Sequence, residues 1–175
     1  MLGLNENAPA FELPSALNGR VSMIRLADVR SEWIVLFFYP RDFSFVCPTE
    51  VTGFHRSLAE FEAEDCSVLG ISVDSVQSHM SWAHELGGIG YPLLSDEGGT
   101  LARAFGVLDE REHLAQRATF ILRKDRAVAY AMVSPVNVGR SVNETLRVLR
   151  ALRTGRLCPA EWMPGMDFGP AGLKF

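Results

Sequence analysis

The sequence has few cysteines, no long apolar run and no strong excess of either charge, and each shortage excludes a class of protein. The longest apolar run, 33–39, has seven residues, whereas a membrane-spanning helix needs about 20. The 17 basic and 21 acidic side chains give a net charge of −4, unlike the basic domains that bind nucleic acids. We therefore expect neither a membrane protein nor a nucleic-acid-binding protein.

The three cysteines are Cys47, Cys66 and Cys158. They are too few and too far apart for a disulfide-stabilised scaffold, and an odd number leaves at least one unpaired within a single chain. The N-terminal residues show neither the basic nor the apolar region of a signal peptide, so we expect a cytoplasmic protein. In that reducing compartment a cysteine is more often catalytic, redox-active or simply buried than structural.

The sequence does contain enough apolar side chains for a packed core. Apolar residues make up 47% of the chain and include 11 phenylalanines, which argues against disorder. A length of 175 residues fits one domain of roughly 150 residues. No repeat or linker divides the chain, so we expect a single domain over 1–175, with 154–175 as a C-terminal tail.

Strand-like and helix-like segments alternate along the chain. The buried run 33–39 predicts a central strand, and the apolar spacing in 48–64 predicts an amphipathic helix. Further strands are expected at 67–73, 91–94, 118–122 and 127–133, further helices at 76–86, 100–105 and 141–153, and short strands or an extended arm in the first 30 residues. This alternation predicts an α/β fold around a central sheet, followed by a tail with little helix.

Cys47 lies where the predicted central strand leads into a helix. Pro48 favours the first helical position, which places Cys47 at the N-cap. There the free N–H groups of the first turn and the helix dipole favour an anion such as a thiolate. Glu50 would oppose that thiolate from the third helical position, so we expect an arginine between them. The competing interpretation is a small buried Cys47 beside a proline turn, with Glu50 as a capping residue.

The segment FFYPRDFSFVCPTE, which contains Pro40-(x₃)-Ser44-(x₂)-Cys47, closely resembles the peroxidatic loop of the peroxiredoxins. Other segments that resemble this family are GISVDS at 70–75, YPLLSD at 91–96, RATFI at 117–121, VGRSVNET at 138–145 and CPAEW at 158–162. The last is similar to the resolving-cysteine segment of the typical two-cysteine subgroup. That subgroup includes the peroxide-reducing component of bacterial alkyl hydroperoxide reductase and the thioredoxin peroxidases.

The resemblance implies a thioredoxin-like fold with an N-terminal extension and a C-terminal tail that carries the resolving cysteine. It implies a thiol-dependent peroxidase that reduces hydrogen peroxide and organic hydroperoxides. In such an enzyme Cys47 attacks the peroxide O–O bond and becomes a sulfenic acid. The partner subunit's Cys158 then condenses with the sulfenic acid and forms an intersubunit disulfide.

The resemblance also implies supporting roles for other residues. Pro40 shields the pocket from water, Ser44 hydrogen-bonds the thiolate or a peroxide oxygen, and Arg117 lies beside the sulfur. Glu50 and Arg140 orient Arg117. We also expect Trp82 to pack near the pocket. No metal, haem, flavin or other cofactor is implied. The implied assembly is a homodimer, or a decamer of five dimers, and the implied reductant is thioredoxin or a dedicated flavoprotein reductase.

Several alternatives remain open from the sequence. The same active site would suit an oligomeric holdase chaperone, a peroxide-sensing redox relay or a one-cysteine peroxidase. We interpret Cys66 as a packing residue of a buried strand. The four histidines, His55, His79, His84 and His113, show no metal-ligand spacing, and a cysteine protease would need one of them beside Cys47.

The departures from the family pattern predict resistance to overoxidation. Ser44 replaces the commoner threonine, and Ala118 stands where many relatives have glycine. The loop 87–90 (GGIG) resembles the Gly-Gly-Leu-Gly loop of peroxide-sensitive family members, but Tyr91-Pro92 follows it directly, so the insert is short. The sequence also shows no Tyr-Phe-bearing terminal helix like that of those members. We expect rapid local unfolding around Cys47 and prompt disulfide formation. Mass spectrometry across a peroxide titration measures this, and sulfinic Cys47 accumulating at near-stoichiometric peroxide would contradict it.

Overall fold

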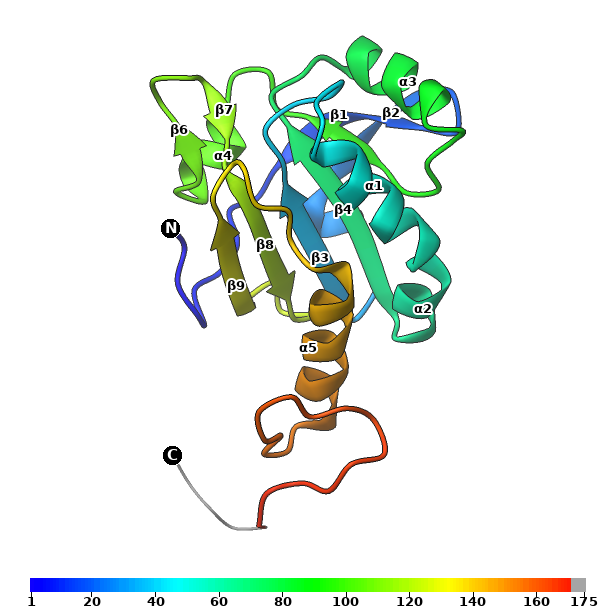
Figure 1. The fold of residues 1–175 in the computed structure, drawn as a ribbon. Helices are drawn as coiled ribbons and strands as arrows, with labels where there is room; N and C mark the ends of the chain where they lie inside the picture. The colour runs from blue at the N-terminus through cyan, green and yellow to red at the C-terminus, as the bar shows by residue number, and fades with distance from the viewer. Residues whose placement is uncertain (171–175) are drawn as a thin grey trace.

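A mixed seven-stranded sheet forms the centre of the computed structural model, which describes residues 1–170 (Figure 1). In spatial order its strands are β2 (Arg20–Arg25), β1 (Glu12–Leu17), β5 (Leu93–Ser95), β4 (Cys66–Ser72), β3 (Trp33–Phe38), β8 (Arg117–Leu122) and β9 (Val128–Ser134). The central strands β3, β4 and β5 run parallel, and every other neighbouring pair is antiparallel. The short strands β6 (Leu108–Asp109) and β7 (Leu114–Ala115) pair separately.

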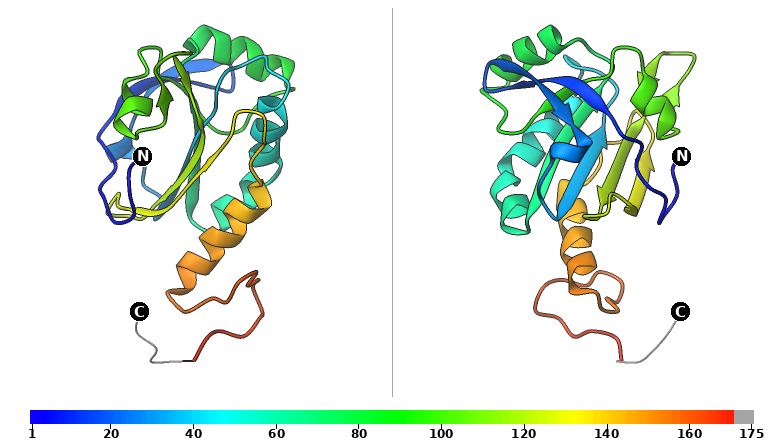
Figure 2. Two further views of the ribbon diagram at one scale, coloured as in Figure 1. Left: turned by 60° about the vertical axis from the view of Figure 1, so that its left-hand side comes forward. Right: turned by 180° about the vertical axis from the view of Figure 1, so that it is seen from behind.

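Helices cover both faces of the sheet. The helices α1 (Cys47–Arg56) and α2 (Leu58–Ala63) connect β3 to β4, and α3 (Val76–Glu85) connects β4 to β5. The remaining helices are the 3-10 helix η1 (Leu26–Asp28), α4 (Thr100–Ala104) and α5 (Val142–Thr154). Figure 2 shows α1, α2 and α5 on one face, and α4 with the N-terminal segment on the other. The predicted α/β fold is confirmed.

The continuous apolar run of β3 reflects burial on both faces. Successive side chains of a strand point to opposite faces. Val35 and Phe37 therefore join the core beneath α1, α2 and α5, whereas Leu36 and Phe38 join the core beneath α4. A continuous apolar sequence is typical of a central strand that is covered on both faces.

Most predicted elements match the structure to within one residue at each end, and two differ by more than that. The helix expected over 48–64 is interrupted at Ser57, which leaves the helical conformation between α1 and α2. The apolar spacing continues through the break because both helices lie on the same face, so periodicity could not reveal it. The strand expected at 91–94 begins at Leu93, since Pro92 has no N–H for the ladder. The β6–β7 pair was not predicted.

The predicted start of α5 is confirmed. The Ser141 side chain occupies the N-cap and accepts a hydrogen bond from the backbone N–H of Glu144 at 3.1 Å. The Glu144 carboxylate pairs with Arg147, so only the half of a capping box that Ser141 supplies is formed. The helix ends at Gly155, whose φ of 60° lies in the left-handed region that glycine adopts without strain.

The sheet topology places the candidate site at the carboxyl end of β3. In open α/β sheets, ligands bind beyond the carboxyl ends of the parallel strands. The loop of residues 39–46 leaves β3 at that edge and leads directly into α1. Within residues 1–170, the structure has no helix of the length and apolar character needed to cross a membrane.

Candidate active site

Cys47 is the first residue of α1, and its side chain is fully buried. Val46, and not Cys47, occupies the N-cap, so the predicted cap position is wrong by one residue and Glu50 is the fourth helical residue. Pro48 still lies in the first turn, where its missing N–H costs nothing because those groups have no intrahelical partner. The loop before Cys47 is more open, since Phe45 is 94% exposed.

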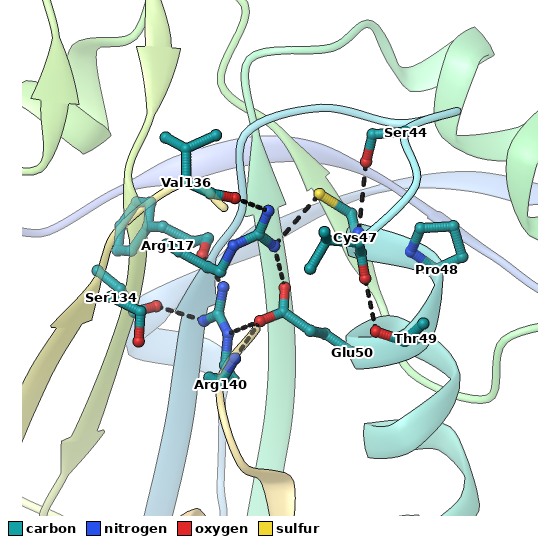
Figure 3. Close-up of polar contacts among 12 residues, drawn as sticks. Ser44, Cys47, Pro48, Thr49, Glu50, Arg117, Ser134, Val136 and Arg140 are labelled. Atoms are coloured by element: carbon teal, nitrogen blue, oxygen red, sulfur yellow. Dashed lines mark hydrogen bonds and ion pairs between the residues drawn. The ribbon is translucent and has the colours of Figure 1, made fainter. Parts of the chain in front are cut away.

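Arg117 supplies the cation beside the cysteine. Its Nη1 lies 3.4 Å from the Cys47 Sγ and also donates to Oε2 of Glu50 (Figure 3). Arg117 begins β8, which pairs antiparallel with β3, so the start of one strand meets the end of the other. Within residues 1–170 no backbone amide donates to the sulfur. The expected contact with first-turn N–H groups is therefore not formed, and the guanidinium takes that place.

The rest of the Arg117 guanidinium is also held inside the protein. Its Nη2 donates to the carbonyl oxygen of Val136 at 2.9 Å. Its Nε is buried and finds no acceptor among residues 1–170. A buried N–H without an acceptor is uncommon because its desolvation is not compensated. The buried guanidinium of Arg117 therefore retains one unused donor.

Glu50 joins two buried arginines. Its Oε1 accepts from the backbone N of Arg140 at 2.7 Å and from the Arg140 Nε at 3.0 Å. The Arg140 Nη1 donates to the Ala118 carbonyl at 2.6 Å, and Nη2 donates to the Phe38 carbonyl. These two hydrogen bonds attach Arg140 to β8 and β3, the strands that flank the site. Burial lowers the pKa of Arg140, and the Glu50 carboxylate acts in the opposite direction.

The charges of this cluster favour an anion at Cys47. Two guanidiniums, of Arg117 and Arg140, face one carboxylate, of Glu50, and all three side chains are buried. One positive charge is therefore left without a partner inside the protein, where an unpaired charge is costly. A thiolate on Cys47 would neutralise it.

Pro40 and Ser44 flank the cysteine from the loop. Pro40 is buried and Ser44 is half-buried. The Ser44 Oγ accepts a hydrogen bond from the backbone N–H of Cys47 at 3.3 Å. The hydroxyl therefore contacts the cysteine backbone here, and no contact with the sulfur is formed.

Trp82 lies behind the loop in a group of aromatic rings. Its ring centroid is 5.7 Å from that of Tyr39 and 6.2 Å from that of Phe43, a loop residue. Trp82 and Cys47 belong to the same buried apolar cluster. Trp82 therefore packs against the loop and makes no hydrogen bond to Arg117 or Glu50.

Cys158 lies in the tail beyond α5, well away from Cys47 of the same chain. Its Sγ is 3.5 Å from the Thr154 Oγ1 and 3.8 Å from the Ala151 carbonyl oxygen. The thiol is half-exposed and lines a surface groove of about 540 Å³. Figure 1 shows this tail at the end of α5 that is remote from the start of α1.

The tail that carries Cys158 is folded back on itself. The Gly169 N–H donates to the Leu157 carbonyl at 2.8 Å and closes the segment. Inside it, the buried Trp162 stacks on Phe168 with a centroid distance of 5.4 Å. Arg147 of α5 donates to the Trp162 carbonyl at 3.2 Å. This segment has a small apolar core of its own.

Cys66 and the histidines lie apart from this chemistry. Cys66 begins β4, and burial raises the pKa of its thiol to about 12. Such a thiol is protonated at neutral pH and is a poor nucleophile. Across residues 1–170 no group of three or more His, Cys, Asp and Glu side chains could hold a metal ion.

A buried polar network that the sequence did not predict lies next to the loop. It joins Asp42 to His79 of α3, with an Oδ2–Nδ1 distance of 2.8 Å. One signal was present in the sequence. His79 lies between Val76 and Trp82 on the buried face of α3, where a polar side chain requires a buried partner.

Comparisons with known proteins identify the family of this chain. A family model described as the AhpC/TSA family matches residues 4–131. The chain belongs to the AhpC/TSA family. A relative of this AhpC/TSA chain, the putative peroxiredoxin YkuU of Bacillus subtilis (strain 168), is 42% identical over 172 residues, which cover 93% of this chain and 95% of that protein. Peroxiredoxin 2 of Drosophila melanogaster is 41% identical, with coverages of 93% and 89%.

Solved structures show the same fold. The Enterococcus faecalis AhpC structure has 35% identity and a TM-score of 0.86, and the match covers 91% of this chain and all of that one (100%). The reduced Plasmodium vivax 2-Cys peroxiredoxin has 30% identity and a TM-score of 0.88, with coverages of 94% and 91%. The expected thioredoxin-like fold is confirmed, and this AhpC/TSA chain is a thiol-dependent peroxidase.

Proposed function

We propose that Cys47 is the peroxidatic cysteine and that Arg117 stabilises its thiolate and the charge that develops on the peroxide. The observation that carries this proposal is the Arg117 Nη1, which lies 3.4 Å from the Cys47 sulfur and is held there by Glu50. Fixed donors aimed at developing charge provide a large part of enzymatic rate acceleration. Here the donor is preorganised by buried ion pairs.

In the first step, the Cys47 thiolate attacks one oxygen of the peroxide. The S–O bond forms while the O–O bond breaks, the sulfur is oxidised to a sulfenic acid, and the other oxygen leaves as hydroxide or alkoxide and takes up a proton. The buried Nε–H of Arg117 has no acceptor in residues 1–170, which supports a role for it as a donor to one of these oxygens. Hydrogen peroxide and small organic hydroperoxides are the proposed substrates.

In the second step, the thiol of the partner subunit's Cys158 condenses with the sulfenic acid, releases water and forms a disulfide. A disulfide requires Cα atoms within about 7 Å. Within one chain, Arg150 and Arg153 near the end of α5 pair with Glu64, which follows α2. Glu64 is separated from Cys47 by the length of α1 and α2. At about 1.5 Å per helical residue, the end of α5 beside Glu64 therefore lies on the order of 20 Å from Cys47. The geometry therefore supports a disulfide between two chains.

A dithiol reductant of the thioredoxin class, or a flavoprotein reductase, would return both cysteines to thiols. The proposed assembly is a cytoplasmic homodimer, or a decamer of five dimers. The chain is proposed to be one domain over 1–175 with the resolving tail at 154–175, of which 171–175 lie outside the described residues.

Non-reducing gel electrophoresis after addition of one equivalent of hydrogen peroxide tests this proposal. The unmodified protein should form a disulfide-linked dimer band, and both Cys47→Ser and Cys158→Ser should lose it. Cys66→Ser is the matched control and should keep the band, since the Cys66 thiol is buried and protonated. A dimer band that persists in Cys158→Ser would refute resolution between chains.

A further inference from the structure

A buried polar network holds the loop before Cys47 against α3, and the proposed chemical steps do not use it. We call it the Asp42 network, and its members are Tyr39, Asp42, Asp74, Ser78 and His79. The side chains of Asp42 and His79 are almost completely buried. The network therefore joins a loop residue to the interior of the protein, five residues before the peroxidatic cysteine.

Asp42 makes four polar contacts. Its Oδ1 accepts from the Tyr39 hydroxyl at 2.9 Å, and its Oδ2 accepts from the Ser78 hydroxyl at 2.8 Å. The same Oδ2 lies 2.8 Å from the His79 Nδ1. The Asp42 backbone N–H donates to Oδ2 of Asp74 at 2.9 Å. One loop residue is thus bound to the end of β3, to the β4–α3 connection and to α3.

The partners of His79 fix the positions of its protons. Its Nε2 lies 3.1 Å from the Leu94 carbonyl oxygen, which can only accept, so Nε2 carries a proton. Its Nδ1 faces the Asp42 carboxylate, which also accepts, so a second proton lies between them. The Tyr39 hydroxyl is closer to Asp42, at 2.9 Å, than to Nδ1, at 3.3 Å, and donates to the carboxylate.

Loss of the proton between His79 and Asp42 would break the network. A nitrogen lone pair would then face a carboxylate, and a buried negative charge would lose its partner. The other titratable groups in the network are Tyr39 and Asp74. Burial, and after it the Asp42 carboxylate, raise the pKa of Tyr39, so the phenol keeps its proton and remains a donor to Asp42.

We propose that the Asp42 network is a proton-dependent device that positions the peroxidatic loop: it keeps the loop closed over Cys47 and releases it when pH rises and the proton between Asp42 and His79 is lost. This rests on the proposed function, in which the buried Cys47 sulfenic acid must leave its pocket to reach the partner subunit's Cys158. Asp42 and His79 are positioning residues, since neither contacts the sulfur.

The closed and open loops lead to different products. In the closed loop the sulfenic acid stays in the peroxide pocket, where a second peroxide oxidises it to the sulfinic acid. In the open loop it reaches the resolving thiol. The ratio of disulfide to sulfinic acid at a fixed peroxide concentration therefore measures loop opening. In the unmodified protein, this ratio should increase with pH more steeply than ionisation of the resolving thiol alone explains.

Asp42→Asn is the first test. The amide can donate to a neutral His79, so the shape is kept while the shared proton and the ion pair are removed. Hydrogen bonds to charged groups are stronger than neutral ones, so we expect about a tenfold higher ratio of disulfide to sulfinic acid at neutral pH. The extra pH dependence should disappear. Asp109→Asn, at the end of β6, where the carboxylate accepts exposed hydrogen bonds from the backbone of the following turn, is the matched control and should behave like the unmodified protein.

Ser78→Ala is the second variant and guards against a folding defect in the first. It removes one hydrogen bond from Asp42 but leaves the shared proton. It should increase loop opening and retain the pH dependence of the unmodified protein. A structural defect alone would not separate the two variants in this way.

Amide hydrogen exchange of the reduced protein, read on a peptide covering 40–47, measures loop opening without any peroxide chemistry. Asp42→Asn should speed this exchange about tenfold. Unchanged exchange and an unchanged product ratio at every pH would overturn the proposal. Failure of the proposed function would look different, because the exchange effect would remain while no peroxide-induced disulfide formed.

Discussion

Replacing Arg117 by methionine is expected to lower kcat/KM for hydrogen peroxide by about 10²–10³-fold. The variant removes the donor 3.4 Å from the Cys47 sulfur and the buried Nε–H beside it. The remaining Glu50 and Arg140 still form a neutral ion pair, so the fold should be retained. Stopped-flow measurement of the second-order oxidation rate, read from tryptophan fluorescence, gives the effect directly.

Two further variants sharpen this experiment. Arg117→Lys keeps the charge but not the planar fork of donors, so its rate should fall between those of methionine and arginine. Arg103→Met removes an exposed arginine, whose partner is Glu110, and should leave the rate unchanged. Arg117→Met oxidising at the rate of the unmodified protein would disprove the role proposed for the guanidinium.

Replacing Glu50 by glutamine should destabilise the protein by about 3–5 kcal/mol, because it leaves two buried guanidiniums without a counter-charge. The Glu50 oxygens accept from Arg117 and from both the backbone and the side chain of Arg140. A glutamine would turn an NH₂ group toward one of these donors. For a chain of this size the expected loss corresponds to a fall in Tm of about 10 °C, measured by thermal unfolding.

The exposed ion pair of Glu110 with Arg103 provides the control. The Arg103 Nε and Nη2 lie 2.7 and 2.9 Å from the two Glu110 carboxylate oxygens. This geometry is that of a strong ion pair, but solvent screens exposed ion pairs. Glu110→Gln should therefore leave the Tm unchanged. If Glu50→Gln melted at the same temperature as the unmodified protein, the cluster would not be the buried ion network described above.

Local chemistry predicted part of the site, and the fold supplied the rest. Cys47 and Glu50 are close in the sequence, which predicted a cation between their side chains. The local pattern could not show which arginine supplies that cation. Arg117 is 70 positions from Cys47, and Arg140 is 90 positions from Glu50. Only the antiparallel pairing of β8 with β3 brings Arg117 to the site. The family resemblance assigned it in advance because relatives share that topology.

The same reasoning explains what was missed. The elements followed from apolar periodicity, but a one-residue break such as Ser57 leaves that periodicity intact. The contact between Asp42 and His79 spans 37 positions and depends on how α3 packs against the end of β3. Neither residue belongs to a sequence motif that would mark the pair, because a buried hydrogen-bonded pair is defined by its surroundings in the fold.

The length of α5 has a consequence for how activity depends on protein concentration. The helix begins next to Arg140 and ends just before the segment that bears Cys158, and its 13 residues span about 20 Å. As a rigid spacer it keeps the two cysteines of one chain apart. Under the proposed scheme a lone chain could be oxidised once but could not complete a cycle. Specific activity would then decline on dilution, as mass action separates the subunits.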